Sequence, residues 1–104
     1  MVFKKVLPRC MMPLTSVHYL LTAHGFKKSG SEDNPIYQAK VQDASTQTEY
    51  QINIPVRIDQ DYKHVKLGKV YMNDVEPMPF PIKNAIHCKL KEIADYLYRV
   101  KVPL

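Results

Sequence analysis

The sequence has little of what a secreted or membrane-spanning chain needs. Its 104 residues include only two cysteines, Cys10 and Cys88, too few for the disulfide framework of a small secreted domain, although one bridge between them stays open. No apolar run approaches the roughly 20 residues of a membrane span. Near the N-terminus, Lys4, Lys5 and Arg9 interrupt the stretch where a signal peptide would need an apolar core. We therefore expect a cytoplasmic protein that does not enter a membrane.

The sequence also lacks the motifs of catalysis and of cofactor binding. Its three glycines, Gly25, Gly30 and Gly68, lie too far apart to form a phosphate-binding loop. His87 and Cys88 are helix neighbours whose side chains point about 100° apart, so they do not form a thiol–base pair, and we interpret Cys88 as a small buried or half-buried residue. The histidines do not have metal-ligand spacing. We predict no catalytic residue, no cofactor and no metal site, and the sequence identifies no small-molecule ligand.

Composition and length indicate one ordinary globular domain. Hydrophobic residues make up 45% of the chain and charged residues 24%. A chain of this length can bury about 65% of the surface that it exposes when unfolded, which suffices for a modest core. We expect residues 1–104 to form a single domain. Its 15 Lys and Arg against 10 Asp and Glu give a net charge of +5, so an anionic partner is compatible with the charge.

The segment from Pro13 to Phe26 predicts the first helix, because its apolar residues share one helical face. Either Pro13 or the Thr15–Ser16 pair can open this helix. Gly25 is placed for the left-handed position that follows a helix, and Phe26 can then pack back onto Leu21.

The hydrophobic period then changes from a helical one to a period of two. Residues 27–35 are polar and contain turn formers, so they predict a turn. Residues 37–42 and 50–58 alternate between apolar and polar side chains and are joined by a short polar connection, which predicts an antiparallel hairpin. Pro55 cannot donate to a strand ladder, so it must lie at an edge, a bulge or a strand end.

A third strand and a second helix follow. Residues 64–72 alternate with a slip at Gly68, a natural position for a β-bulge. Residues 77–81 are rich in proline and predict an extended linker within the domain. From Ile82 to Val100, apolar residues recur at steps of three or four, which predicts a helix with one apolar face and Pro81 in its first turn.

The expected order α-β-β-β-α predicts an α+β fold of two layers, in which an antiparallel meander carries both helices on its apolar face. Three short runs, His24–Phe26 at the helix end, Ile54–Val56 at the end of a tyrosine-containing hairpin, and Leu67–Gly68, resemble the small YugN-like proteins of Bacillus relatives. The resemblance covers about residues 14–68 and implies the same fold and a bacterial cytoplasmic setting. Because that family has no established activity, the resemblance implies no functional residue.

The strand alternation predicts an interaction face. If the apolar residues between Tyr50 and Ile58 face the helices, their polar neighbours point away and form an open sheet face. We expect that face to be rich in amides and cations and free of acids. Its predicted residues are Gln38, Lys40, Gln51, Asn53, Arg57 and Lys66.

Two functions remain open at this stage. The favoured one is a non-catalytic interaction protein that forms a homodimer or small oligomer through this face or through residues 78–80. The alternative is a weak accessory nucleic-acid binder that contacts phosphates with Lys40, Arg57, Lys66 and Lys69. Four such contacts would give single-stranded binding a log–log salt slope of about −2.8. Because the polar strand positions hold no stacking aromatic residues, we predict no specific nucleic-acid binding.

Overall fold

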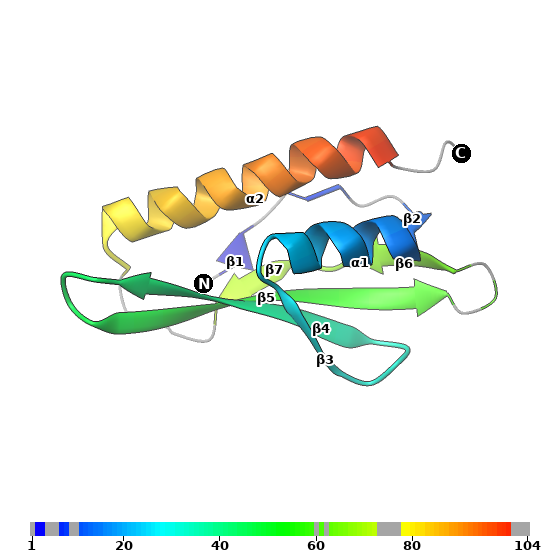
Figure 1. The fold of residues 1–104 in the computed structure, drawn as a ribbon, viewed down its shortest axis with the longest axis horizontal. Helices are drawn as coiled ribbons and strands as arrows, with labels where there is room; N and C mark the ends of the chain where they lie inside the picture. The colour runs from blue at the N-terminus through cyan, green and yellow to red at the C-terminus, as the bar shows by residue number, and fades with distance from the viewer. Residues whose placement is uncertain are drawn as a thin grey trace.

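The computed structural model describes residues 2–3, 7–8, 11–59, 61, 63–72 and 78–100, and it confirms the expected α+β architecture of two layers. The strands form an antiparallel sheet in the order β1–β7–β5–β4–β3, and β6 lies between β2 and β5. Both helices lie on the same side of this sheet (Figure 1). No helix of the described residues covers the other side of the sheet.

Helix α1 (Leu14–Ala23) ends as the sequence predicts. Gly25 has a φ of +87°, the left-handed conformation that a Cβ disfavours. The Phe26 backbone N–H donates to the carbonyl of Leu21 at 2.9 Å, and Phe26 is only 2% exposed. At the other end the helix begins directly after Pro13, which makes no side-chain capping bond. The start is thus set by Pro13 and not by the Thr15–Ser16 pair.

Strands β4 (Pro35–Asp43) and β5 (Thr48–Asp59) form the predicted antiparallel hairpin. In the connecting turn, Asp43 Oδ1 accepts hydrogen bonds from the Ser45 hydroxyl at 2.7 Å and the Ser45 backbone N–H at 3.1 Å. The side-chain bond from Ser45 is the main cause that lowers the pKa of Asp43. The Asp43 side chain thus binds the backbone two residues further on, which stabilises the turn that sets the register of the hairpin.

Strand β3 (Lys27–Gly30) was predicted as part of a turn, and that prediction is wrong. It pairs antiparallel with β4, with Lys28 opposite Tyr37. All four of its residues are exposed, because β3 is the edge strand of the sheet and neither helix covers it. An edge strand exposed on both faces shows no apolar alternation, so the sequence carries no period-two signal for it.

The predicted third strand is present as two short strands separated by a bulge. Strands β6 (His64–Leu67) and β7 (Val70–Met72) both pair with β5. From the pair Val56–Leu67 to the pair Ile52–Met72, β5 steps back four residues while the third strand advances five, so one extra residue is inserted.

The bulge also accommodates Pro55, as predicted. The Gly68 backbone N–H donates to the Pro55 carbonyl at 2.8 Å. A Cβ on Gly68 would lie 3.2 Å from the Pro55 Cβ, so the glycine permits this close approach.

Two short strands near the N-terminus complete the sheet. Strand β1 (Val2–Phe3) pairs with β7, and β2 (Met12–Pro13) pairs with β6. Neither strand was predicted from the sequence, because two residues are too few to show a period. Both extend the sheet on the side of β5 opposite to β4.

Helix α2 (Phe80–Val100) begins two residues earlier than Ile82, the first residue predicted to be helical. Phe80 and Pro81 therefore belong to the helix and not to the extended linker expected at residues 77–81, whose first residue, Pro77, lies outside the described residues. Pro81 stands in the first turn as predicted, where its missing N–H leaves no hydrogen bond unmade. The apolar face of α2 contributes Ile86, Leu90, Ile93 and Leu97 to the core.

The apolar side of β5 faces the helices as predicted. The buried residues on it are Tyr50, Ile52, Ile54, Val56 and Ile58. Tyr37 lies on the same side of β4 and is fully buried, and its hydroxyl is 2.7 Å from His18 Nδ1 on α1. The polar alternate residues of both strands must then lie on the opposite side.

Candidate functional site

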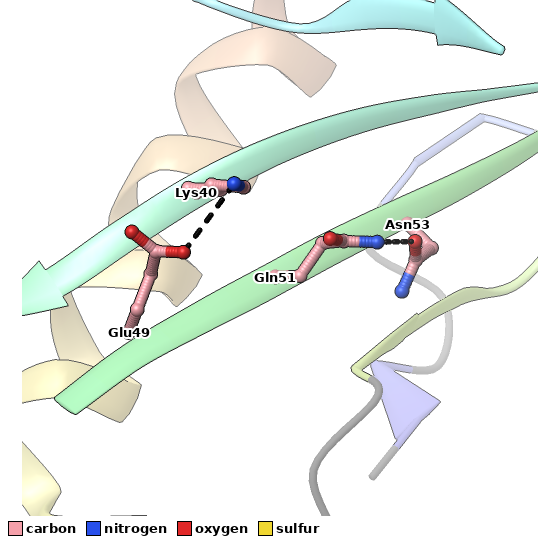
Figure 2. Close-up of polar contacts among 4 residues, drawn as sticks. All are labelled: Lys40, Glu49, Gln51 and Asn53. Carbon is pink, nitrogen blue, oxygen red and sulfur yellow. Dashed lines mark hydrogen bonds and ion pairs between the residues drawn. The ribbon is translucent and has the colours of Figure 1, made fainter.

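The structure brings the six predicted interaction residues together on the sheet side opposite to the helices, which we call the polar face. They form three pairs of directly opposed residues on neighbouring strands: Gln38 with Asn53, Lys40 with Gln51, and Arg57 with Lys66. Glu49 and Gln42 form a fourth pair on the same face. Figure 2 shows Lys40, Glu49, Gln51 and Asn53 on strands β4 and β5, with α2 behind the sheet.

Asn53 lies on the polar face as expected, at its centre, but it is buried there, at 0% exposed. Its Oδ1 accepts hydrogen bonds from Gln38 Nε2 and Gln51 Nε2, each at 3.0 Å. Its Nδ2 donates to the backbone carbonyl of Tyr71 on β7 at 3.2 Å. Asn53 is therefore satisfied within the sheet, and it fixes the orientation of two glutamine amides beside it.

The expectation that the polar face carries no acids is wrong. Lys40 Nζ lies 3.4 Å from Glu49 Oε1 (Figure 2), and both side chains are more than half exposed, at 66% and 56%. An exposed ion pair of this kind stabilises the fold by less than about 1 kcal/mol. Strand β5 begins at Thr48, earlier than predicted, which brings Glu49 into the same alternation as Gln51.

The other end of the polar face is basic and concave. Arg57 and Lys66 are opposite each other on β5 and β6, and both line two neighbouring depressions of about 480 and 490 Å³. Asn34 borders both depressions, and Asp33 and Asp59 border one of them. In the part of the chain that the structure describes, no carboxylate oxygen lies within 4.0 Å of Arg57 or Lys66. Two like charges placed directly opposite each other destabilise a sheet slightly, and an anionic group between them would reverse that effect.

The remaining residues considered from the sequence do not join this face. Cys88 is a free, exposed cysteine, so the interpretation of it as buried or half-buried is wrong, while Cys10 lies outside the described residues. Met78 packs against the core, whereas Phe80 is exposed. Among the described residues there is no group of three or more His, Cys, Asp or Glu side chains that could hold a metal ion. Within the same residues, no helix is long and apolar enough to cross a membrane.

A second surface feature, a groove between the two helices, was not predicted from the sequence. We call it the interhelix groove. It has a volume of about 500 Å³ and is lined by Ser16, Tyr19, Leu20, Ala23, His24, Glu92, Tyr96 and Arg99. Tyr19 is 77% exposed and Tyr96 is 46% exposed. The sequence held one indication of this groove. Tyr19 and Tyr96 lie outside the apolar stripes of their helices, at positions where a large aromatic side chain does not pack into the core.

The comparisons with known proteins support the fold and give no activity. The solved structure of the uncharacterized conserved protein YugN from Geobacillus kaustophilus HTA426 is similar to this chain, with a TM-score of 0.77 and 16% sequence identity. The match covers 94% of this chain and 95% of YugN. No family model matches the sequence, and no curated protein matches it. The YugN-like resemblance expected from the sequence is thus confirmed at the level of the fold.

Proposed function

We propose that this chain is a non-catalytic interaction protein that forms a homodimer through its polar face. The observation that carries this proposal is the charge order along β5. Glu49 lies four residues before Asn53, and Arg57 lies four residues after it, on the same face. Opposite charges therefore stand about 13 Å on either side of a central amide.

This order makes the face complementary to itself. In a face-to-face pair, the two-fold axis lies between the two sheets, and it can run perpendicular to β5 and pass over Asn53. That axis reverses the strand direction and places Glu49 of one copy over Arg57 of the other, twice. Arg57 and Lys66 border the two depressions, so the Glu49 side chain of the second copy would enter a concave basic site. Two new ion pairs would then form in the same symmetric contact.

The centre of the face is prepared for such a contact. Gln38 and Gln51 are held by hydrogen bonds to Asn53, so they lose little side-chain freedom when a partner arrives. Each glutamine uses one N–H for Asn53 and keeps its carbonyl oxygen and a second N–H for other bonds. An amide surface that both donates and accepts can pair with an identical surface.

The size of the face indicates a weak dimer. Strand β4 has nine residues and is about 30 Å long, and three neighbouring strands are about 14 Å wide, so the projected area is about 420 Å². A standard stable interface buries about 800 Å² on each partner. Side chains that project from the sheet add to this flat area, but the contact remains smaller than a standard stable interface. We therefore expect a dissociation constant in the micromolar range, set by the charge pairs and the amides.

The exposed edge of the sheet is less suited to self-association. The edge strand β3 carries Lys27 and Lys28, both exposed. Lysines on an edge strand oppose pairing with the edge of another sheet, because the same charges would meet there. This arrangement favours association through the face over association through the edge.

The acids on the polar face weigh against nucleic acid as the partner. Glu49 already pairs with Lys40, so one of the expected phosphate contacts is neutralised within the chain. Asp59 lies on the same face, opposite His64. A phosphate backbone running along the face would approach both carboxylates.

For the cellular location of the protein we propose the bacterial cytoplasm, where an exposed free cysteine such as Cys88 stays reduced.

The test is the mass of the protein in solution as a function of concentration, measured by sedimentation equilibrium. We expect the wild-type chain to shift from monomer to dimer in the micromolar range. Arg57→Glu should weaken the dimer at least about tenfold, because like charges then face each other. Lys91→Glu, the same charge change at an exposed position of α2, is the matched control and should leave the dimer unchanged. A wild-type chain that stays monomeric up to about 1 mM, or equal effects of the two variants, would contradict the proposal.

A further inference from the structure

The interhelix groove has the composition of a small-molecule site. Its volume of about 500 Å³ falls within the roughly 300–1,000 Å³ of ligand pockets in proteins. Tyr19, Leu20, Ala23 and Tyr96 are half of its lining residues, and polar residues stand among them. From Ser16 to His24 the groove follows α1 for about 12 Å, which suits one small molecule and not an extended macromolecule.

The two tyrosines are placed to hold a flat apolar group. Tyr19 and Tyr96 come from different helices and border the same groove, and both are exposed although they are large and mostly apolar. The ring of His24 contacts Tyr96 at a centroid distance of 6.3 Å with the planes tilted by 54°, so neither ring covers the other. Aromatic surface that the protein leaves uncovered in a concave place is what an aromatic ligand would bury.

The charges of the groove specify the polar part of the ligand. Arg99 lies with its guanidinium 5.6 Å from the centre of the Tyr96 ring, so its position is defined by a cation–π contact. His24 adds a ring nitrogen that can form a hydrogen bond, and Glu92 is the one acid among the described residues of the lining. No carboxylate oxygen of the described residues lies within 4.0 Å of Arg99. A planar guanidinium beside an aromatic ring is suited to bind a carboxylate through two parallel hydrogen bonds.

From this arrangement we propose that the interhelix groove binds a small aromatic carboxylate, whose ring contacts Tyr19 and Tyr96 and whose carboxylate pairs with Arg99. The site lies on the helix layer, whereas the polar face lies on the other side of the sheet (Figure 1). The proposal is therefore independent of the proposed dimer. Ligand binding and dimer formation can be measured separately and can fail separately.

The experiment compares two probes of the same size and ring system, 2-naphthoate and the neutral 2-naphthamide, in which an NH2 group replaces one carboxylate oxygen and removes the charge. Their binding to the full chain is followed by isothermal titration calorimetry, with backbone amide shifts in NMR to locate the site. We expect 2-naphthoate to bind with a dissociation constant below about 1 mM and 2-naphthamide to bind about tenfold more weakly, the effect of one charge-assisted contact at a partly exposed site. The shifts should centre on α1 and α2.

Three variants complete the test. Arg99→Gln should remove the difference between the two probes, while Lys91→Gln, on the exposed side of the same helix, should leave it unchanged. Ala23→Leu should fill the groove and abolish the binding of both probes without loss of the fold, because Ala23 is exposed and leucine is a good helix former. Equal affinity for the two probes, binding that survives Ala23→Leu, or no binding of 2-naphthoate up to about 5 mM would overturn the proposal. A change of oligomeric state caused by Ala23→Leu would also overturn it, because the groove would then be a contact between copies.

Discussion

Replacing His18 by leucine tests how helix α1 is attached to the sheet. Tyr37 is fully buried on β4, and its hydroxyl lies 2.7 Å from Nδ1 of His18 on α1. The two rings also contact each other edge to face, with centroids 5.7 Å apart. Leucine at position 18 keeps the apolar contact but removes the hydrogen-bond partner. The buried hydroxyl of Tyr37 is then left without that bond.

The expected loss follows from the burial of Tyr37. A buried hydroxyl that loses its partner destabilises the folded state by about 1–3 kcal/mol. Leucine is a slightly better helix former than histidine, which offsets only a few tenths of a kcal/mol. We therefore expect His18→Leu to lower the free energy of unfolding by about 2 kcal/mol. The melting temperature should fall by about 8–16 °C, since 1 kcal/mol corresponds to about 4–8 °C in a domain of this size.

A double-mutant cycle separates this effect from loss of packing. Tyr37→Phe removes the hydroxyl and should cost about 1 kcal/mol, the net contribution of one hydrogen bond. The double variant, with both partners apolar, should cost at least about 1 kcal/mol less than the sum of the single variants. Urea unfolding followed by circular dichroism gives the free energies. All samples are compared at one low protein concentration, because dimer formation would add stability that depends on concentration.

Two results would refute this reasoning. The first is a His18→Leu variant with the stability of the wild type, which would show that the hydroxyl of Tyr37 finds another partner. The second is additivity of the two single variants within about 0.5 kcal/mol, which would show that the two side chains do not interact.

Three further predictions follow from the fold and the polar face. Gly25→Ala should lower the stability by about 1 kcal/mol through backbone strain, since Gly25 has a φ of +87° and an added Cβ would meet no atom within 4 Å; an unchanged melting temperature would contradict it. Burial raises the pKa of Tyr37 above its ordinary value of 10.0, so the wild type should lose stability as the pH rises above 10.0, and Tyr37→Phe should lose less in urea unfolding at alkaline pH. Labelled single-stranded and duplex oligonucleotides should bind no tighter than micromolar at low salt and not at all at about 0.15 M salt, and nanomolar affinity there would favour the alternative function.

The sequence predicted the parts of the fold in which one apolar face repeats with a clear period. The β4–β5 hairpin and helix α2 were predicted for this reason, since residues such as Ile54 and Leu90 recur on one face and are fully buried. The end of α1 was predicted because Gly25 followed by Phe26 is a local signal that does not depend on the rest of the chain.

What the sequence did not predict depends on neighbours that are distant in the chain. The edge strand β3 shows no period because all four of its residues are exposed, so that no element of the described residues covers either of its sides. The burial of Asn53 requires Gln38 and Tyr71, which come from two other strands. The interhelix groove depends on how α1 and α2 approach each other, which periodicity within one helix does not specify.

The polar face shows the same limit in another form. Its six predicted residues do lie on one face, because the period of two is strict along β4 and β5. Glu49 was omitted because it was assigned to the hairpin connection, although it shares the alternation of Gln51. Strand ends are poorly determined by pattern alone. Here the inclusion of Glu49 in β5 adds the negative charge on which the proposed dimer depends.

The most direct test of the proposed dimer is to mix two variants that should not dimerise alone. Glu49→Lys makes positions 49 and 57 both basic, and Arg57→Glu makes both acidic, so each variant should remain monomeric at concentrations where the wild type is a dimer. In an equimolar mixture, each changed residue faces an opposite charge on the other variant, and sedimentation equilibrium should show a heterodimer. Lys91→Glu mixed with Asp95→Lys, exposed on α2, should behave as the wild type throughout. If the Glu49→Lys and Arg57→Glu variants stay monomeric after mixing, the polar face does not form the proposed symmetric dimer.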